Sequence, residues 1–220
     1  MRIIIVGGGK LAYYLVKTLL PYKHNITLVE IRKETSERLA NEFDHINVFH
    51  GDGTTIRTLE EIGCQKADFY VAVTGKDENN LVGCQVAKQR FHVKTTVARV
   101  NNPKNVDMFN LLGIDRVYSG TQILADIIEQ EIDYIGLRIV FSIDKTSKVI
   151  VEFKLSLRSP ACGKTLQEYT FPGSANIVML TRKNGEVEMP RGGLVMAAGD
   201  IMLMACDRND FDAIWRLMVR

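Results

Sequence analysis

The sequence predicts an α/β protein, in which a doubly wound parallel sheet is followed by a small α+β domain. Through residues 1–119, apolar β-branched segments alternate with helical patterns, which is typical of parallel strands joined by helices. The first apolar segment ends in a glycine-rich turn, Gly7-Gly8-Gly9. After Gly136 the alternation stops, and Asn184-Gly185 between two strand-like segments predicts a hairpin.

The first thirty residues carry a dinucleotide-binding fingerprint. A strand over residues 1–6 leads into G-x-G-x-x-A, an amphipathic helix follows with Leu11, Leu15 and Leu19 on one face, and a second strand ends at Glu30. Gly7 would permit the tight turn, Gly9 the approach of a pyrophosphate, and Ala12 close packing of the helix on the sheet. Phosphates would lie at the helix N-terminus, and Glu30 would accept hydrogen bonds from a ribose diol.

The remaining elements of this domain follow with short gaps. Strands are predicted at 46–50, 67–73, 94–100 and 115–118, and helices at 54–62, 77–91 and 103–112. Six strands by residue 118 fit a compact Rossmann-like domain over residues 1–119.

Residues 120–136 are predicted to form a helix that links the two domains. Its apolar residues lie opposite acidic and amide side chains; they are Ile123, Leu124, Ile127, Ile128, Ile132 and Ile135. Two interpretations remain open. The stripe packs on the helix's own sheet, or it forms an interdomain or subunit contact.

Residues 137–220 are predicted to form the small α+β domain. Strands are expected at 149–155, 176–182, 186–190 and 201–206, with a short capped helix at 163–168 and a closing helix at 210–218.

Composition excludes several classes of protein. The chain has 28 basic and 26 acidic residues, so nothing indicates a nucleic-acid partner. No apolar run is long enough to cross a membrane and no signal peptide precedes the first strand, so we expect a cytoplasmic protein. The four cysteines and four histidines lack metal-ligand spacing, which predicts reduced thiols and no metal site. The second domain has no histidine and no nucleophile–base constellation, so we expect no catalytic residues.

The sequence resembles the regulatory subunits of the Trk/Ktr potassium-uptake systems, in which an N-terminal RCK (or KTN) domain precedes a C-terminal RCK domain. The matching segments are 7–12, 28–30, 51–54, 67–74, 77–81 and 98–103 in the first domain, and 163–166, 177–182, 185–186 and 190–200 in the second. Its single pair of domains is similar to the short members of that family.

The resemblance implies a set of nucleotide-binding residues. Phosphates would be wrapped by residues 7–11, the ribose held by the acid at 30, and the adenine held near the third strand; the full set is Gly7, Gly8, Gly9, Lys10, Leu11, Glu30, Asp52, Gly53, Thr74, Gly75 and Arg99. Three positions have an alternative role. Asp52 and Thr74 would cap helices, and Arg99 would form a structural ion pair.

The same resemblance implies a regulatory protein with NAD(H) or ATP/ADP as ligand. It would form a homo-oligomer, a dimer or a ring, that binds an integral-membrane potassium transporter or channel at the inner face of the plasma membrane. Gly120-Thr121 lacks the carboxylate with which some ATP-gated members hold a divalent cation, so no metal is expected.

Two alternatives stay open at this point. In the first, the chain would be a small NAD-dependent oxidoreductase. The Glu30 carboxylate would repel the 2′-phosphate of NADP, although the cations Arg32 and Lys33 lie close to it in sequence. In the second alternative, cyclic di-AMP would bind the C-terminal domain, as it does in some related proteins.

Overall fold

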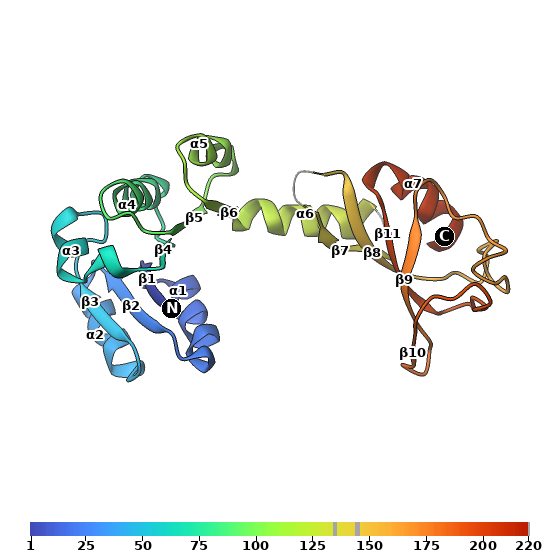
Figure 1. Ribbon diagram of the computed structural model, residues 1–220, viewed down its shortest axis with the longest axis horizontal. Helices are drawn as coiled ribbons and strands as arrows, with labels where there is room; N and C mark the ends of the chain where they lie inside the picture. The colour runs from blue at the N-terminus through green and yellow to red at the C-terminus, as the bar shows by residue number, and fades with distance from the viewer. Residues whose placement is uncertain (134–135, 144–145, 220) are drawn as a thin grey trace. The chain divides into compact units, whose positions relative to one another are not determined.

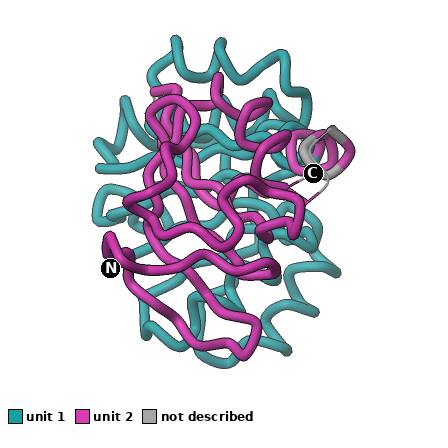
Figure 2. The backbone as a smooth tube through the Cα atoms, turned by 90° about the vertical axis from the view of Figure 1, so that its right-hand side faces the viewer, with its two compact units in different colours: residues 1–124 teal, residues 125–220 magenta. Residues whose placement is uncertain are grey.

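The computed structural model describes residues 1–133, 136–143 and 146–219. The chain divides into two compact units, Met1–Leu124 and Ala125–Arg220 (Figure 2). The boundary falls within the predicted linker segment, and each unit has a hydrophobic core of its own.

The first unit is built on a six-stranded sheet (Figure 1). Its strands are β1 (Arg2–Val6), β2 (Asn25–Glu30), β3 (Asn47–His50), β4 (Phe69–Ala72), β5 (Thr95–Val100) and β6 (Arg116–Ser119). The order is β3-β2-β1-β4-β5-β6, and every neighbouring pair is parallel. The strand order reverses between β1 and β4, which is where ligands bind open sheets of this kind. The predicted Rossmann-like sheet is confirmed.

Helices cover both faces of this sheet, because successive strand side chains point to opposite sides. Ile3 and Ile5 of β1 belong to a core with side chains of α1 (Lys10–Leu19) and α2 (Lys33–Glu42). Ile4 and Val6 belong to the other core, with side chains of α3 (Ile56–Glu61), α4 (Asp77–Gln89) and α5 (Val106–Leu111). Short 3₁₀ turns at Leu20–Tyr22, Cys64–Lys66 and Pro103–Asn105 complete the connections.

The buried face of α1 differs from the one predicted. Ala12 and Val16 are fully buried, Leu15 and Leu19 are partly buried, and Leu11 is exposed. The fold needs the small Ala12 against the sheet, which turns Leu11 outward. Helix α2 was not predicted from the sequence, because only Ser36 and Leu39 of its ten residues are buried.

Helix α6 (Gly120–Asp133) crosses the boundary between the two units. The apolar residues Ile123, Leu124, Ile127, Ile128 and Ile132 are all exposed, each between 48% and 68%. The interpretation that they pack on the helix's own sheet is therefore wrong for these residues. Ile135, the last member of the predicted stripe, lies outside the described residues.

The second unit contains a five-stranded antiparallel sheet in the order β10-β9-β11-β8-β7. The strands are β7 (Leu137–Ser142), β8 (Lys148–Lys154), β9 (Asn176–Thr181), β10 (Val187–Glu188) and β11 (Ile201–Asp207). A 3₁₀ turn (Arg208–Asp210), α7 (Phe211–Ile214) and a π-helical turn (Trp215–Val219) end the chain. Phe211, Ile214 and Met218 join the core beneath the sheet.

Two predictions for this unit were incomplete or wrong. Residues 163–168 form turns, and Thr165 makes a bridge to Val195, so the expected capped helix is absent from this described segment. Glu168 nevertheless accepts a hydrogen bond from the Thr165 N–H at 2.9 Å, which is the contact that imitated a helix cap. Strand β7 was not predicted from the sequence. It is an edge strand with a bulge between Ile139 and Phe141, which breaks the alternation of apolar and polar residues.

Candidate functional site

The glycine turn after β1 lies against the loop that follows β4. Gly7 has φ +107°, a conformation that favours glycine, and a Cβ there would lie 3.1 Å from the backbone of Thr74. Its N–H donates to the Val29 carbonyl at 2.8 Å, which joins the turn to β2. Gly7 therefore lets three strand ends meet without a side chain between them.

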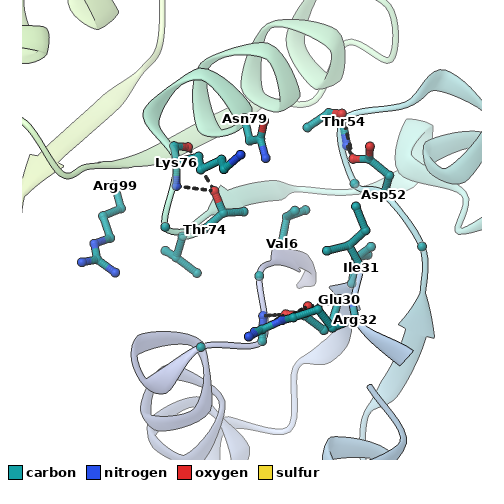
Figure 3. A pocket seen from close by; sticks show the side chains of 18 residues that line it. Val6, Glu30, Ile31, Arg32, Asp52, Thr54, Thr74, Lys76, Asn79 and Arg99 are labelled. Carbon is teal, nitrogen blue, oxygen red and sulfur yellow. Dashed lines mark hydrogen bonds and ion pairs between the residues drawn. The ribbon is translucent and has the colours of Figure 1, made fainter. Parts of the chain in front are cut away.

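A cavity of about 430 Å³ opens at this meeting point (Figure 3). It is formed by the carboxyl ends of β1 to β5 and the start of α4, and its described lining residues are Val6, Gly7, Gly8, Gly9, Val29, Glu30, Ile31, Arg32, Gly51, Asp52, Gly53, Thr54, Val73, Thr74, Gly75, Lys76, Asn79 and Arg99. A volume of this size is typical of small-molecule sites.

Most residues predicted from the sequence meet in this cavity. Nine of the eleven line it, namely Gly7, Gly8, Gly9, Glu30, Asp52, Gly53, Thr74, Gly75 and Arg99. Lys10 and Leu11 do not line it and are exposed on the first turn of α1. Their side chains are therefore not part of the cavity wall, and only their backbone N–H groups remain candidates for phosphate contact.

The N-terminus of α1 faces this cavity with open space around Gly9. Gly9 is the N-cap and makes no side-chain cap, and no acidic residue lies in the first turn. A Cβ at Gly9 would meet nothing within 4 Å, and its backbone is extended with φ −77° and ψ −178°. Unsatisfied N–H groups and the helix dipole make such an end suited to an anion.

Glu30 lies beneath the glycine turn and is only 3% exposed. Its carboxylate accepts from the N–H of Gly8 at 2.5 Å, and from the backbone N–H and the Nε of Arg32, both at 2.8 Å. Burial opposes ionisation, but the hydrogen bonds from Arg32 and Gly8 outweigh it and lower the pKa of Glu30 below its ordinary value. Glu30 is therefore an anion that the turn itself depends on.

Asp52 closes the turn that follows β3. One of its carboxylate oxygens accepts from the Thr54 N–H at 2.9 Å and from the Thr54 hydroxyl at 2.8 Å. The cap of α3 is instead Thr55, whose hydroxyl accepts from the Thr58 N–H. The alternative that Asp52 caps this helix is therefore wrong.

Asn80 fixes the opposite wall of the cavity. It is fully buried, and its side-chain oxygen accepts from the Thr74 N–H at 2.9 Å and lies 2.7 Å from the Thr74 hydroxyl. Its amide nitrogen donates to the Thr74 and Arg99 carbonyls at 3.2 and 2.8 Å. The Thr74 hydroxyl also accepts from the Lys76 N–H at 3.2 Å, but Lys76 is the N-cap residue of α4 and the helix has no side-chain cap, so the alternative that Thr74 caps it is wrong.

Arg99 at the end of β5 presents its guanidinium to the cavity (Figure 3). Among the described residues its side chain forms no ion pair, so the alternative of a structural ion pair is wrong. Its backbone is held by Asn80 and by strand β5, while the guanidinium is available to a ligand. Arg99, Lys76 and the α1 N-terminus give the cavity several groups that attract an anion.

The cavity offers little for acid–base or nucleophilic chemistry. Its described lining contains no histidine, cysteine, serine or tyrosine, and both carboxylates already accept hydrogen bonds from the protein. In the described part of the chain, no cluster of three or more histidine, cysteine, aspartate or glutamate residues could hold a metal ion. The arrangement is suited to holding an anionic ligand.

Several lining residues were not predicted from the sequence, among them Ile31, Arg32, Lys76 and Asn79. Ile31 and Arg32 follow β2 and Lys76 follows β4, so the rule that ligands bind at the carboxyl ends of parallel strands was a signal that could have found them. Asn79 comes from the first turn of α4 and had no such signal.

Both units of the chain match known protein domains. The TrkA-N domain model matches residues 3–120, and the TrkA-C domain model matches residues 150–218. A Trk system potassium uptake protein TrkA homolog from Methanothermobacter thermautotrophicus is 30% identical over 199 residues, which is 90% of each chain. A TrkA homolog from Archaeoglobus fulgidus is 30% identical and covers 97% of this chain, which spans only 49% of that relative.

Solved structures give the same fold. The GsuK channel bound to NAD has a TM-score of 0.67 at 19% identity, covering 98% of this chain and 39% of that one. A structure of GsuK bound to ADP has a TM-score of 0.52 at 24% identity and covers 60% of this chain and 34% of that one.

No helix in the described residues is long and apolar enough to cross a membrane.

Proposed function

The chain belongs to the TrkA family, and from this premise we propose that it is a nucleotide-sensing regulatory subunit that gates a membrane potassium channel or transporter. The observation that carries the proposal is the cavity at the β1–β4 switch point. It offers an open helix N-terminus and the cations Arg99 and Lys76, but no histidine, cysteine, serine or tyrosine in its described lining. A ligand that is bound without being consumed fits a regulatory role.

The proposed ligand is an adenine nucleotide, NAD(H) or ATP/ADP. Phosphates would lie over Gly9 and the α1 N-terminus, with Arg99 opposite them. The ribose and adenine would extend past β2 toward Asp52 and Gly53. Solved structures of GsuK, which shares the fold, are bound to NAD or to ADP, which supports both ligand classes.

Regulation requires that the nucleotide prefer one of two conformations of the protein. A ligand shifts such an equilibrium only by its difference in affinity, typically about 1–3 kcal/mol per site. Several sites linked in one assembly would sharpen the response. We propose that the chain forms a homo-oligomer, a dimer or a larger ring, on an integral-membrane potassium-conducting partner, and so works at the cytoplasmic face.

The apolar stripe of α6 supports the proposed assembly. Ile123, Ile127 and Ile128 are about half exposed, although isoleucine is usually among the most buried residue types. A contiguous exposed apolar surface of this kind marks an interaction site.

The C-terminal unit has a cavity of its own, for which cyclic di-AMP is a second candidate ligand. The cavity measures about 370 Å³, and Tyr169, Phe171 and Arg191 contribute to its lining. Aromatic faces and a guanidinium suit a base and a phosphate respectively. A cyclic di-AMP titration that leaves the thermal midpoint unchanged would remove this candidate.

The test of the proposed function is ligand binding without turnover. Thermal unfolding of the full chain is followed with NAD⁺, NADH, ATP and ADP, each from zero to millimolar concentration. A ligand at 100 times its dissociation constant adds about 2.7 kcal/mol to the stability of the native state, which gives a readable shift. Measurable hydride transfer in an absorbance assay would favour the oxidoreductase alternative, and no shift with any nucleotide would remove the proposal.

A further inference from the structure

Glu30, the acid expected to bind the ribose, already accepts hydrogen bonds from the protein at all of its acceptor positions. One oxygen of Glu30 accepts from the backbone N–H and the Nε of Arg32, and the other accepts from the Gly8 N–H and from the Arg32 Nη2 at 3.3 Å. A carboxylate has about four lone-pair positions, so these four donors fill them. With Arg32 in this place, Glu30 has no vacant position for a ribose hydroxyl.

Arg32 is the accessible partner in this pair. Its side chain is 64% exposed whereas that of Glu30 is 3% exposed, and Arg32 lines the cavity. Nε and Nη2 face Glu30, which leaves the two N–H groups of Nη1 for the cavity, since no residue in the described chain accepts from them. Figure 3 shows the guanidinium lying beside Glu30, on the side of the glycine turn.

Building on the proposed function, we infer that Arg32 rather than Glu30 meets the adenosine ribose, and that the site takes dinucleotides phosphorylated at the ribose 2′-oxygen as well as unphosphorylated ones. A bare Glu30 would repel a 2′-phosphate. Paired with Arg32, its charge is cancelled locally, and the N–H groups of Nη1 that Glu30 does not use are donors for a phosphate. Arg32 also lies just after β2, where the ribose of a bound dinucleotide is expected.

Lys33 provides a matched control because it carries the same charge at the next position. It does not line the cavity, and its ammonium lies 3.9 Å from Glu37 on the exposed surface of α2. Long-range attraction of an additional phosphate would be weakened similarly by loss of either cation. A direct contact would be lost only with Arg32.

The experiment is calorimetric titration of the full chain with NADH and NADPH, and with AMP and adenosine 2′,5′-bisphosphate as probes without nicotinamide. The wild-type dissociation constant for NADPH should lie within ten-fold of that for NADH. In Arg32→Gln the ratio of the two constants should rise at least five-fold, and the ratio for the bisphosphate and AMP should rise in parallel. Lys33→Gln should change both ratios less than five-fold.

Arg32→Lys keeps the positive charge but lacks the planar guanidinium. It provides a second test of the same ratio if circular dichroism shows that Arg32→Gln is poorly folded. It should raise the NADPH-to-NADH ratio less than Arg32→Gln does. The inference is overturned if wild-type NADPH binds more than ten-fold weaker than NADH, or if the ratio rises less than five-fold in Arg32→Gln. Binding of none of the nucleotides would instead overturn the proposed function, so the two failures are distinguishable.

Discussion

Each sheet of this protein ends a strand at a partly buried arginine, and the two arginines have opposite partners. Arg99, at the end of a parallel strand, has its backbone fixed by Asn80 and its guanidinium free of any ion pair with the described residues. Arg182, at the end of an antiparallel strand, donates to Glu188 at 2.5 Å, to Asp200 at 2.6 Å and to the Val195 carbonyl at 2.9 Å. The Arg99 guanidinium is therefore available to a ligand, whereas the Arg182 guanidinium stabilises the fold of the second unit.

The difference follows from strand direction. In a parallel sheet all carboxyl ends lie at one edge, so polar groups from distant segments gather there around a shared space. In an antiparallel sheet the ends alternate between two edges, so the polar groups of the second unit meet one another in pairs across loops. Burial opposes the charge of Arg182, but Glu188 and Asp200 together keep its pKa above the ordinary value.

The largest effect is expected on α6, whose described apolar residues Ile123, Leu124, Ile127, Ile128 and Ile132 are exposed. Ile127→Glu combined with Ile128→Glu should split the proposed assembly into smaller folded species, because each isoleucine contributes about 1.5–3 kcal/mol when fully buried. Size-exclusion chromatography with light scattering gives the mass, and circular dichroism checks the fold. Glu129→Gln, on the same helix, should leave the mass unchanged. A double variant of wild-type mass would place this face in solvent.

The comparison between the two arginines is tested directly by removing each. Arg182→Gln leaves the Asp200 carboxylate, 3% exposed, without its ionic partner. The expected loss of stability is about 3 kcal/mol, at the lower end of the range for buried pairs because Arg182 is itself 23% exposed. Arg99→Gln should leave the thermal midpoint unchanged and weaken nucleotide binding instead. Equal destabilisation by both variants would contradict the contrast.

Gly9 and Gly8 separate ligand contact from fold within the same turn. Gly9→Val should weaken NADH, ATP and ADP binding by more than about 100-fold, or about 2.7 kcal/mol, because the new side chain occupies the space that a pyrophosphate needs. Its thermal midpoint without ligand should match wild type, since the site is open there. Gly8→Val should unfold the turn, because its Cβ would lie 2.7 Å from both Glu30 and Leu39. Normal binding of any nucleotide to Gly9→Val would place that ligand elsewhere.

Glu30→Gln tests how far one carboxylate serves both fold and ligand. Because donors from Gly8 and Arg32 fill its carboxylate, losing the charge should weaken nucleotide binding less than about 5-fold, and only through a less firmly held glycine turn. It should also lower the stability of the ligand-free protein by about 1–2 kcal/mol, because the Gly8 and Arg32 donors lose an ionised acceptor. Titration calorimetry and urea unfolding measure the two effects. A loss of affinity of more than about 30-fold would instead indicate a direct contact between Glu30 and the ligand.

The smallest effect concerns pH and Asp77, which ties the loop after β5 to the start of α4. Burial raises its pKa, but hydrogen bonds from the backbone of Asn101 and Asn102 and from the side chains of Asn105 and Asn101 outweigh this, and the pKa is lowered. A carboxylate with a lowered pKa contributes stability above its unfolded value of 3.8, and that contribution is lost as the pH falls through the folded value. In Asp77→Asn, the decline of the thermal midpoint below pH 4 should therefore be shallower than in wild type.

Local patterns were enough to predict the strands of the first unit, the glycine turn and Glu30, whereas the other cavity residues after β3, β4 and β5 came from the resemblance to the family. The turn needs glycine at a positive φ, and the strands need continuous apolar runs because both faces of the sheet are covered. The missed elements, α2 and β7, bury little on one side and so have weak periodicity. The expected helix at 163–168 was wrong because a turn used the Glu168 contact that helix caps also use.

By itself the sequence determined the order of elements, the two-part organisation and the position of a nucleotide fingerprint, because each depends on neighbouring residues. Only the tertiary structure decided how those residues divide their hydrogen bonds. It showed that Arg32 donates to the Glu30 carboxylate and that the Asn80 side chain joins the ends of β4 and β5 by hydrogen bonds. It also showed that the Arg99 guanidinium forms no ion pair with the described residues and lines the cavity. Such contacts join segments brought together by sheet packing or depend on which way a side chain turns. The strand and helix patterns of the sequence fix neither, because they record the type of each residue along the chain and not its neighbours in space.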